Sequence, residues 1–401
     1  MVGEKEGKIR LPVAGLVIIS LVYILYAWDR LVVPIELVEL RRAFGLDLAA
    51  AGFLSTIFTF GIALTAIPAG FFVIRFGTRV SLVVAAVIFS LCIGYPPFAS
   101  GLGHLTVTQI GSGIGEGLYN VALFSFLGGL SAKYRGTLTG IAASLFGIGI
   151  FSGPLVVAKI LTLSGSWQTA FLSFAIAGLV GAALIGIALG RHDIRSDRTT
   201  GPITLERLRR VLVPRNIGVA VVMAVNGLGL YSFLGLFETF LRTTHHLELA
   251  SASAIVSLFG IGSIVGGSPA GYVADRIGRK LYLLMALILC AIFGVSTYLA
   301  PSTPWLLAAL CFVFGLGVNS VYTNCYALIQ DQVEQDDIPL GTGVLATIYF
   351  LMGAVSGFLL VQARDAFGWG WGSVAIYGVP YLIAAIVMIG LMNADRAVRR
   401  A

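Results

Sequence analysis

The feature that most constrains this chain is a series of continuous apolar blocks, each about as long as a lipid bilayer is thick. About 20 consecutive apolar residues in a helix cross the hydrocarbon core of a membrane, and only helices and closed barrels satisfy every backbone polar group there. The blocks do not alternate with the period of two that a barrel strand requires. The sequence therefore predicts an all-α membrane protein.

Composition supports this class. Of the 401 residues, 58% are hydrophobic and 11% charged, and the mean hydropathy is +0.94, whereas soluble proteins average about 25% charged residues. The first apolar block is too long for a signal peptide, so we expect it to be retained. The cysteines lack the spacing of metal or redox sites and are interpreted as small buried side chains: Cys92, Cys290, Cys311 and Cys325.

The apolar blocks form two groups of six around a polar stretch. We expect an N-terminal six-helix bundle over residues 1–190, a linker over 191–215 and a C-terminal six-helix bundle over 216–401. The twelve candidate spans lie near residues 11–38, 48–73, 80–99, 104–130, 137–162, 167–190, 216–241, 249–274, 281–300, 304–330, 341–363 and 372–393.

Basic residues predict the orientation in the membrane. If the N-terminus is cytoplasmic, most of the 26 lysines and arginines fall in loops on the cytoplasmic side, which obeys the positive-inside rule. We therefore expect a multi-pass protein of the cell (inner or plasma) membrane with both termini cytoplasmic. The basic amphipathic segment from Leu205 to Val213 is expected to lie on the inner leaflet. Because basic residues are spread loop by loop, no nucleic-acid partner is expected.

A segment of the first half recurs in the second. Pro68 to Arg79 lies 201 residues before Pro269 to Lys280, and five positions are identical. Each copy joins the second and third spans of its half. A tight cytoplasmic turn needs glycine and basic residues, but an offset of half the chain favours duplication.

The second copy resembles the G-x-x-x-D-R-x-G-R-K signature of the major facilitator superfamily. The resemblance implies two six-helix bundles around a central cavity, and an acid, here Asp275, that latches the cytoplasmic gate. The first copy has Ile74 in place of the acid and Thr78 in place of the arginine, which argues against a latch in the first half. The residues expected to take part in gating are Gly271, Asp275, Arg276, Gly278 and Arg279.

Two further stretches suggest a branch of that superfamily. Asp29-Arg30 in the first span and Gly113 to Glu116 in the fourth resemble anion:cation symporters, in which the arginine binds an organic carboxylate and the acids respond to protons. Gly115 to Tyr119 also resembles Spinster-like lipid transporters. Many anion symporters carry an arginine seven residues before the glutamate; Gln109 stands there in this chain, which argues against tight binding of a dianion.

The buried charges need a physical reason, because a charge at membrane depth costs roughly 2.5 to 3.5 kcal/mol. Gln109, Glu116 and Asn120 share one face of the fourth helix, and Tyr26 shares a face of the first with Arg30. A substrate bound at Arg30 would change whether Glu116 or Asp29 holds a proton. The alternative is that Arg30 and an acid form a fixed structural pair linking two helices.

The second half offers hydrogen bonds and aromatic surface without a central lysine or arginine. Asn319 and Tyr322 share a face of the tenth span with Tyr326, where they would either bind substrate or form interhelical hydrogen bonds. Asp29 and Glu116 are expected to couple protons. The expected substrate-binding residues are Tyr26, Arg30, Gln109, Asn120, Tyr231, Asn319 and Tyr322.

The chain shows no P-loop, no metal-ligand spacing and no nucleophile with a base at helical spacing. We expect no enzyme activity and no cofactor. The expected function is secondary active transport by alternating access, with a monomer moving a small, monocarboxylate-like organic anion together with protons across the lipid bilayer.

Two alternatives remain. The fifth span, through Gly140, Gly149, Gly153 and Pro154, matches much of a drug-exporter pattern, which favours proton-driven export of lipophilic or amphipathic compounds. The protein could also be a membrane sensor that transports nothing.

Overall fold

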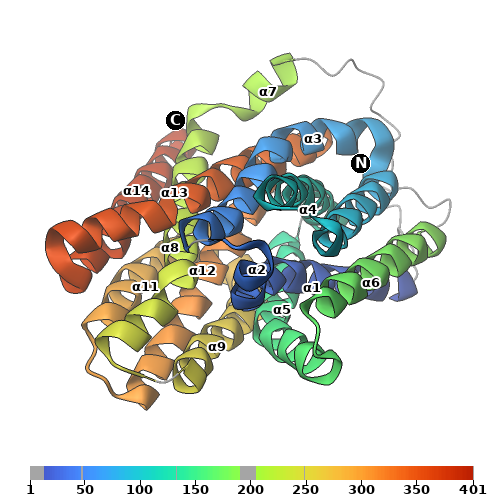
Figure 1. The fold of residues 1–401 in the computed structure, drawn as a ribbon. Coiled ribbons are helices and arrows are strands. Elements are labelled where there is room, and N and C mark those ends of the chain that lie inside the picture. The colour runs from blue at the N-terminus through green and yellow to red at the C-terminus, as the bar shows by residue number, and fades with distance from the viewer. Residues whose placement is uncertain (1–12, 47, 132, 190–204, 248, 401) are drawn as a thin grey trace.

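The computed structural model describes residues 13–46, 48–131, 133–189, 205–247 and 249–400, and the regular structure in these ranges is helical (Figure 1). The first half contains α1 (Val13–Ile35), α2 (Leu37–Phe44), α3 (Leu48–Ile93), α4 (Leu102–Leu130), α5 (Arg135–Ser164) and α6 (Trp167–Ala188). The second half contains α7 (Leu205–Val211), α8 (Pro214–Thr244), α9 (Leu249–Gly266), α10 (Ser268–Ile277), α11 (Arg279–Leu299), α12 (Pro304–Gln332), α13 (Ile338–Ser373) and α14 (Val379–Arg400).

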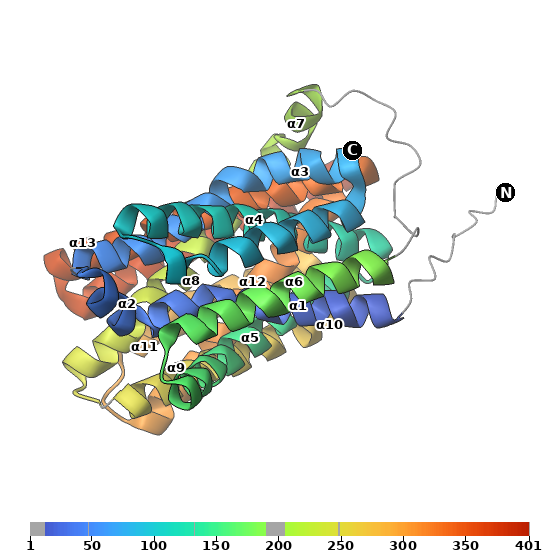
Figure 2. The same ribbon diagram turned by 45° about the vertical axis from the view of Figure 1, so that its right-hand side comes forward.

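Two of these helices each contain a sharp reversal at a glycine. Gly77 in α3 has φ 80° and Gly368 in α13 has φ 72°, a backbone region that glycine enters without steric cost. Figure 2 shows the chain turning back within α3. Gly278, with φ 100°, makes the corresponding turn between α10 and α11. Gly77 and Gly278 occupy the same place in the two sequence repeats, so both repeats build the same hairpin.

The predicted twelve-span, two-bundle fold is confirmed. Eight helical segments of the described chain are long and apolar enough to cross a membrane, or nine if Ala254–Gly266 and Ser268–Ile277, bent by 40°, form one span. Two of the eight, Ile57–Phe98 and Gln335–Ala394, each hold two spans joined at the glycine reversals. The more polar α4 supplies the remaining span.

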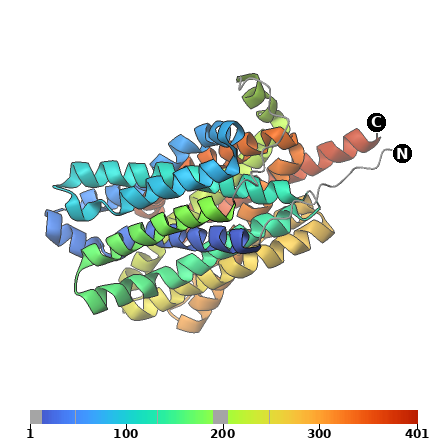
Figure 3. The ribbon, with the colours of Figure 1, turned by 90° about the vertical axis from the view of Figure 1, so that its right-hand side faces the viewer.

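Figure 3 shows the long helices running along a common direction, and the start of α1 and the end of α14 lie at the same end of the molecule. We call this end, which also carries α7, the linker end; the opposite end, which carries α2, is the α2 end. The predicted domain boundaries stay predictions, and residues 190–204 lie outside the described ranges.

Glycines bring the two bundles into close contact near the linker end. A Cβ on Gly271 of α10 would lie 2.1 Å from the carbonyl oxygen of Gly136 in α5, and one on Gly70 of α3 would lie 2.7 Å from that of Pro339 in α13. These contacts are related by the sequence repeat. They pack α10 against α5 and α3 against α13, so the bundles touch through a pair of equivalent helix crossings.

The glycines of the exporter-like pattern also serve packing. A Cβ on Gly149 would lie 2.3 Å from that of Ala27, and one on Gly153 would lie 3.1 Å from Cδ1 of Trp28. Small residues of this kind let membrane helices approach closely. In this structure they seat α5 against α1.

The short helix α7 departs from expectation on its apolar face. Leu208 and Val211 pack in a cluster with Leu340 and Val344 of α13, so this face contacts protein in place of the inner leaflet. The expected contact with lipid remains a prediction for the exposed arginines of α7.

Candidate functional site

The centre of the molecule holds an arginine paired with an acid of its own bundle. Nε of Arg30 in α1 lies 2.7 Å from Oε2 of Glu116 in α4, and their side chains are 7% and 0% exposed. Nη1 of Arg30 donates to the hydroxyl of Tyr231 in α8, at 3.0 Å, and Nη2 donates to the hydroxyl of Tyr26. One guanidinium therefore links both bundles.

Aromatic rings surround this guanidinium. Its Cζ lies between 4.4 and 5.3 Å from four ring centroids. A cation over a ring face is attracted by the ring quadrupole, more strongly when water is excluded. The rings belong to Tyr26, Phe58, Phe146 and Phe350. They hold Arg30 in a fixed, largely dry environment.

A second acid lies beside the pair. Asp29 is 5% exposed, and its Oδ2 accepts a hydrogen bond from Oγ of Ser112 at 3.0 Å. Asp29 directly precedes Arg30 in α1. In the described part of the chain, Oδ1 of Asp29 and Oε1 of Glu116 have no hydrogen-bond donor. Two neighbouring carboxylates resist being ionised together, so this pair is suited to hold a proton.

A cavity of about 20 Å³ opens beside Arg30, which is room for about one water molecule. The site is therefore contracted. Its polar wall includes Arg30, Ser263 and Asn319. Its aromatic wall consists of Tyr23, Phe146, Tyr231, Phe259, Tyr322 and Tyr349.

Four of the predicted binding residues line this cavity: Arg30, Tyr231, Asn319 and Tyr322. Asn319 also has a packing role, because its amide group donates to the carbonyl oxygens of Ala143 at 3.0 Å and Ser263 at 2.6 Å. In this conformation its side chain ties α12 to α5 and α9.

The other three predicted binding residues lie outside the cavity wall. Asn120 bridges the bundles: its amide donates to the hydroxyl of Tyr322 at 3.1 Å, and its carbonyl accepts from that of Tyr326 at 3.3 Å. Tyr26 is fully buried beneath Arg30. Gln109 is buried in α4 nearer the α2 end.

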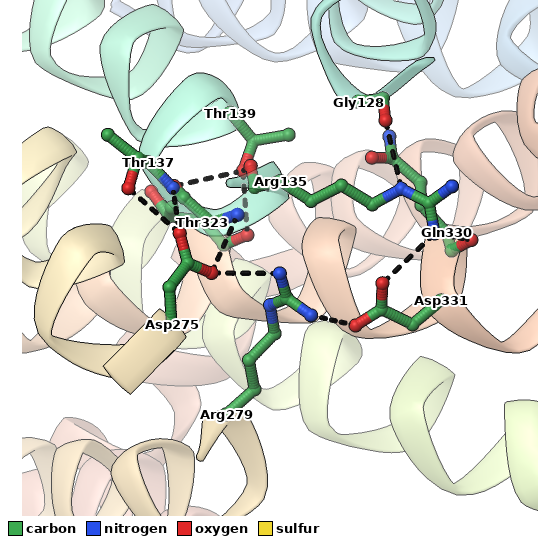
Figure 4. Close-up of polar contacts among 10 residues, drawn as sticks. Gly128, Arg135, Thr137, Thr139, Asp275, Arg279, Thr323, Gln330 and Asp331 are labelled. Carbon is green, nitrogen blue, oxygen red and sulfur yellow. Dashed lines mark hydrogen bonds and ion pairs between the residues drawn. The ribbon is translucent and has the colours of Figure 1, made fainter. Parts of the chain in front are cut away.

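The linker end holds a second charged network, centred on the signature acid (Figure 4). Asp275 accepts hydrogen bonds from the backbone amides of Gly136 at 3.1 Å and Thr137 at 2.9 Å, which belong to the first turn of α5. The hydroxyl of Thr137 and the guanidinium of Arg279 also donate to it, each at 2.8 Å. An acid at a helix N-terminus is favoured by the exposed amides and the helix dipole.

The network continues across the bundles. Arg279 also pairs with Asp331 at the end of α12, and Asp331 accepts from Arg135 of α5 at 2.9 Å. Arg135 further donates to the backbone carbonyl oxygens of Gly128 at 2.9 Å and Gln330 at 2.6 Å. Two arginines and two acids thereby hold the linker ends of both bundles together.

The remaining gating candidates differ in their structural roles. Gly271 is needed for the close approach of α10 to α5, and Gly278 for the turn with positive φ. Arg276 is exposed and lies with its Cζ 4.3 Å from the ring centroid of Tyr272, outside the network in Figure 4.

Sequence reasoning missed several residues that the structure places in these two sites. Arg135 and Asp331 lie between predicted spans, so the sequence pattern assigned them no role in a gate, whereas the structure places them at the start of α5 and in the last turn of α12. Ser112 and the rings of Phe58 and Phe350 carried no signal, because a serine or phenylalanine in an apolar block is ordinary.

Comparisons with known proteins agree with the fold. The family description Major Facilitator Superfamily matches residues 19–357 and 219–401. A hexuronate transporter of Bacillus subtilis is 24% identical over 383 residues, which cover 89% of each chain. A gentisate transporter of Corynebacterium glutamicum is 23% identical over 167 residues, which span 41% of this chain and only 37% of that relative.

A solved structure of the proton:xylose symporter XylE has a TM-score of 0.77 with this chain at 18% sequence identity, and the match covers 94% of this chain and 95% of XylE. At that identity the likeness concerns the fold. Together with the family match over nearly the whole sequence, it establishes that this chain belongs to the major facilitator superfamily of membrane transporters.

Proposed function

We propose that this transporter moves an organic monocarboxylate together with a proton, by alternating access. The observation that carries the proposal is Arg30, a cation on the cavity wall that is held by an acid of one bundle and a hydroxyl of the other. A guanidinium binds carboxylates in a planar, two-bonded geometry. Glu116 occupies part of that fork, so substrate and Glu116 compete for Arg30.

Charge balance supports proton coupling. Arg30 contributes one positive charge, and Asp29 and Glu116 contribute one negative charge each when ionised. A single proton on the acid pair makes the site neutral. A bound monocarboxylate adds a negative charge, so a second proton restores neutrality. Because an unbalanced charge is costly at membrane depth, we propose that one proton enters with each carboxylate.

The wall of the cavity supports a flat, apolar body for the substrate. Six aromatic side chains line it, from both bundles, and aromatic pairs gain about 0.5 to 1.5 kcal/mol beyond simple burial. The second half offers no lysine or arginine on the described wall, so it suits the body of a substrate more than a second acid group. An aromatic monocarboxylate, such as a benzoate, fits both walls. That a relative is named for transport of gentisate supports this class.

We also propose that the linker end faces the cytoplasm. Exposed basic residues gather there, including Arg75, Lys133 and Arg209, and the positive-inside rule places such loops in the cytoplasm. The network around Asp275 then closes the cytoplasmic side.

Uptake into proteoliposomes tests the function. Labelled benzoate should enter faster when the outside is acidic, and unlabelled benzoates should compete while a neutral sugar and a lipophilic cation should not. Glu116→Gln should abolish the pH dependence, whereas the matched variant Glu206→Gln, on the exposed face of α7, should behave as wild type. Uptake of the lipophilic cation against benzoate, with protons leaving, would replace the proposal with export.

A further inference from the structure

The first sequence repeat lacks an acid at the position of Asp275, which binds the start of α5 in the α10–α5 crossing. The equivalent α3–α13 crossing is nevertheless closed. Ile74 stands at the position of Asp275. The helix end that Asp275 binds is the start of α5, and the equivalent end in the other half is the start of α13, where Gly70 packs against Pro339. Proline has no backbone N–H to donate. An acid on α3 would therefore find one amide fewer at this crossing than Asp275 finds at the other.

An acid is present at this crossing, but on the partner helix. Asp337 is the residue directly before α13, where a helix favours negative charge. Its side chain is 3% exposed. Oδ1 accepts from Nε of Arg207 at 2.8 Å and Oδ2 accepts from Arg210 at 3.2 Å. Arg207 also donates to the backbone carbonyl oxygen of Asp336 at 2.9 Å.

Arg207 and Arg210 belong to α7, the short helix of the linker that joins the two halves of the chain. Arg207 is itself nearly buried, with 9% of its side chain exposed, whereas Arg210 is 56% exposed. A buried ion pair with several hydrogen bonds loses much when one partner is removed, because the other charge is left unpaired. The pair of Arg207 and Asp337 is thus a buried polar link between α7 and the residue that precedes α13.

The apolar side of α7 reaches the first bundle as well. Val211, Leu340 and Val344 form a buried cluster, and the partly buried side chains packed against it include Leu208 of α7 and Ile74 of α3. The residue that replaced the signature acid is therefore part of the surface on which α7 rests. In this way α7 packs on α13 and shares one apolar cluster with α3 at the crossing where the bundles meet.

We propose that α7 is a second latch at the linker end, in which the Arg207–Asp337 pair and the Ile74–Val211–Leu340 cluster close the α3–α13 crossing as Asp275 closes the α10–α5 crossing. The proposal rests on the alternating access of the proposed function, because a latch matters only if this end opens. The linker then helps to hold this end closed, in addition to joining the two halves.

Distances across the linker end test the proposal. Spin labels at Arg75→Cys on α3 and Glu334→Cys before α13, both exposed positions, would be measured by pulsed electron resonance in lipid nanodiscs, with the partly exposed Cys92 changed to alanine. In Arg207→Glu the population with longer distances should rise at least about fivefold. The double variant Arg207→Glu with Asp337→Arg should return it toward the parent value.

The matched control is Arg209→Glu, which makes the same charge change on an exposed residue of the same helix. It should leave the distance distribution unchanged. If Arg207→Glu and Arg209→Glu give the same distribution, or if the charge-swapped double variant opens further than Arg207→Glu alone, the latch is refuted. Should Arg207→Glu not fold, Asp337→Asn removes the same pair with little change of shape, and its distances must lengthen.

The measurement needs no substrate, so it remains readable if the proposed carboxylate transport fails. In that event labelled benzoate would not enter proteoliposomes, while the distances would still respond to Arg207→Glu. Conversely, normal benzoate uptake with unchanged distances in Arg207→Glu would overturn the latch and leave the proposed function standing.

Discussion

The two halves of this transporter share a fold but carry charged side chains at different equivalent positions. Arg30 of the first half and Tyr231 of the second are 201 residues apart, the offset of the sequence repeat, and they touch each other at the centre. At the linker end the division is reversed: the second half holds Asp275 where the first has Ile74. The two halves offer equivalent positions, and at each of these two pairs of positions only one half carries the charge. The halves can therefore be compared residue by residue.

The largest expected effect is the loss of the central cation. Arg30→Ala leaves Glu116 buried without its partner, which should destabilise the protein by about 3 to 5 kcal/mol and abolish carboxylate uptake. The equivalent Tyr231→Ala removes no charge and should cost less. Thermal unfolding in detergent and benzoate uptake compare the two variants.

A second substitution separates charge from packing in that comparison. Glu116→Gln added to Arg30→Ala should recover stability, because the unpaired acid is gone, but should not recover uptake. Carboxylate uptake in Arg30→Ala at the wild-type rate would show that Arg30 is a structural pair and not the anion site.

The next effect concerns the two copies of the repeat. Asp275→Asn weakens charge-assisted hydrogen bonds to the start of α5 and to Arg279, each worth about 1.5 to 3 kcal/mol, and should favour opening of the linker end. Ile74→Asp should not create a latch, because the new acid would enter an apolar cluster and lower stability. Labelling of cysteines placed at the linker end would measure opening in both variants.

A tighter closed state in Ile74→Asp would mean that the first crossing lacks only its acid. The proposal that α7 closes that crossing in place of an acid would then be wrong.

Arg276→Ala should leave the rate of cysteine labelling at the linker end at the wild-type value, because that arginine lies outside the network of Asp275.

A smaller effect is expected from the hydroxyl opposite Arg30. Tyr231→Phe keeps the ring on the cavity wall and removes one hydrogen bond to the guanidinium, worth about 1.5 kcal/mol or more because one partner is charged. The free energy of unfolding should fall by about this amount, and the KM for benzoate should change by about tenfold. An unchanged KM would show that the second half provides only surface.

A separate effect, which depends on pH, concerns an acid that only the first half has. Glu36, between α1 and α2, is fully buried, and the equivalent residue of the second half is the buried Phe237. Burial, followed by the nearby charge of Glu39, raises the pKa of Glu36 to about 8. An acid with a raised pKa in the folded state contributes stability that is complete below its unfolded pKa, near 4.3, and is lost as pH rises through the folded pKa.

Stability should therefore fall between about pH 4.3 and pH 8, by at most about 1.4 kcal/mol per pH unit from this group. Glu36→Gln should flatten that slope in thermal unfolding, and Glu39→Gln, which removes only the nearby charge, should flatten it less. An unaltered slope in Glu36→Gln would place the titration elsewhere.

Much of the fold could be predicted from the sequence, because membrane helices are recognised by their length and their apolar composition. The reversals at Gly77 and Gly368 lie between predicted spans. The signature acid Asp275 lies in a network that joins the two bundles, and its role in a gate stays a prediction. What the sequence could not supply were contacts between distant segments. Ser112 beside Asp29, the rings around Arg30 and the pairing of Arg207 with Asp337 depend on how helices cross.

Gln109 illustrates the limit of helical periodicity. It shares a face with Glu116 and Asn120 in the sequence pattern, yet it lies toward the α2 end and outside the cavity. A shared face says which direction a residue points and not how far along the helix the site extends.

A carboxylate and a proton are expected to load together, so that the site around Arg30 stays neutral. The most direct test measures, in one set of proteoliposomes, lumenal acidification, benzoate entry and membrane current. One proton should enter with each benzoate, without current, and Glu116→Gln should uncouple the two fluxes. Benzoate entry that carries net charge, or that proceeds without acidification in the unmodified protein, would contradict the account.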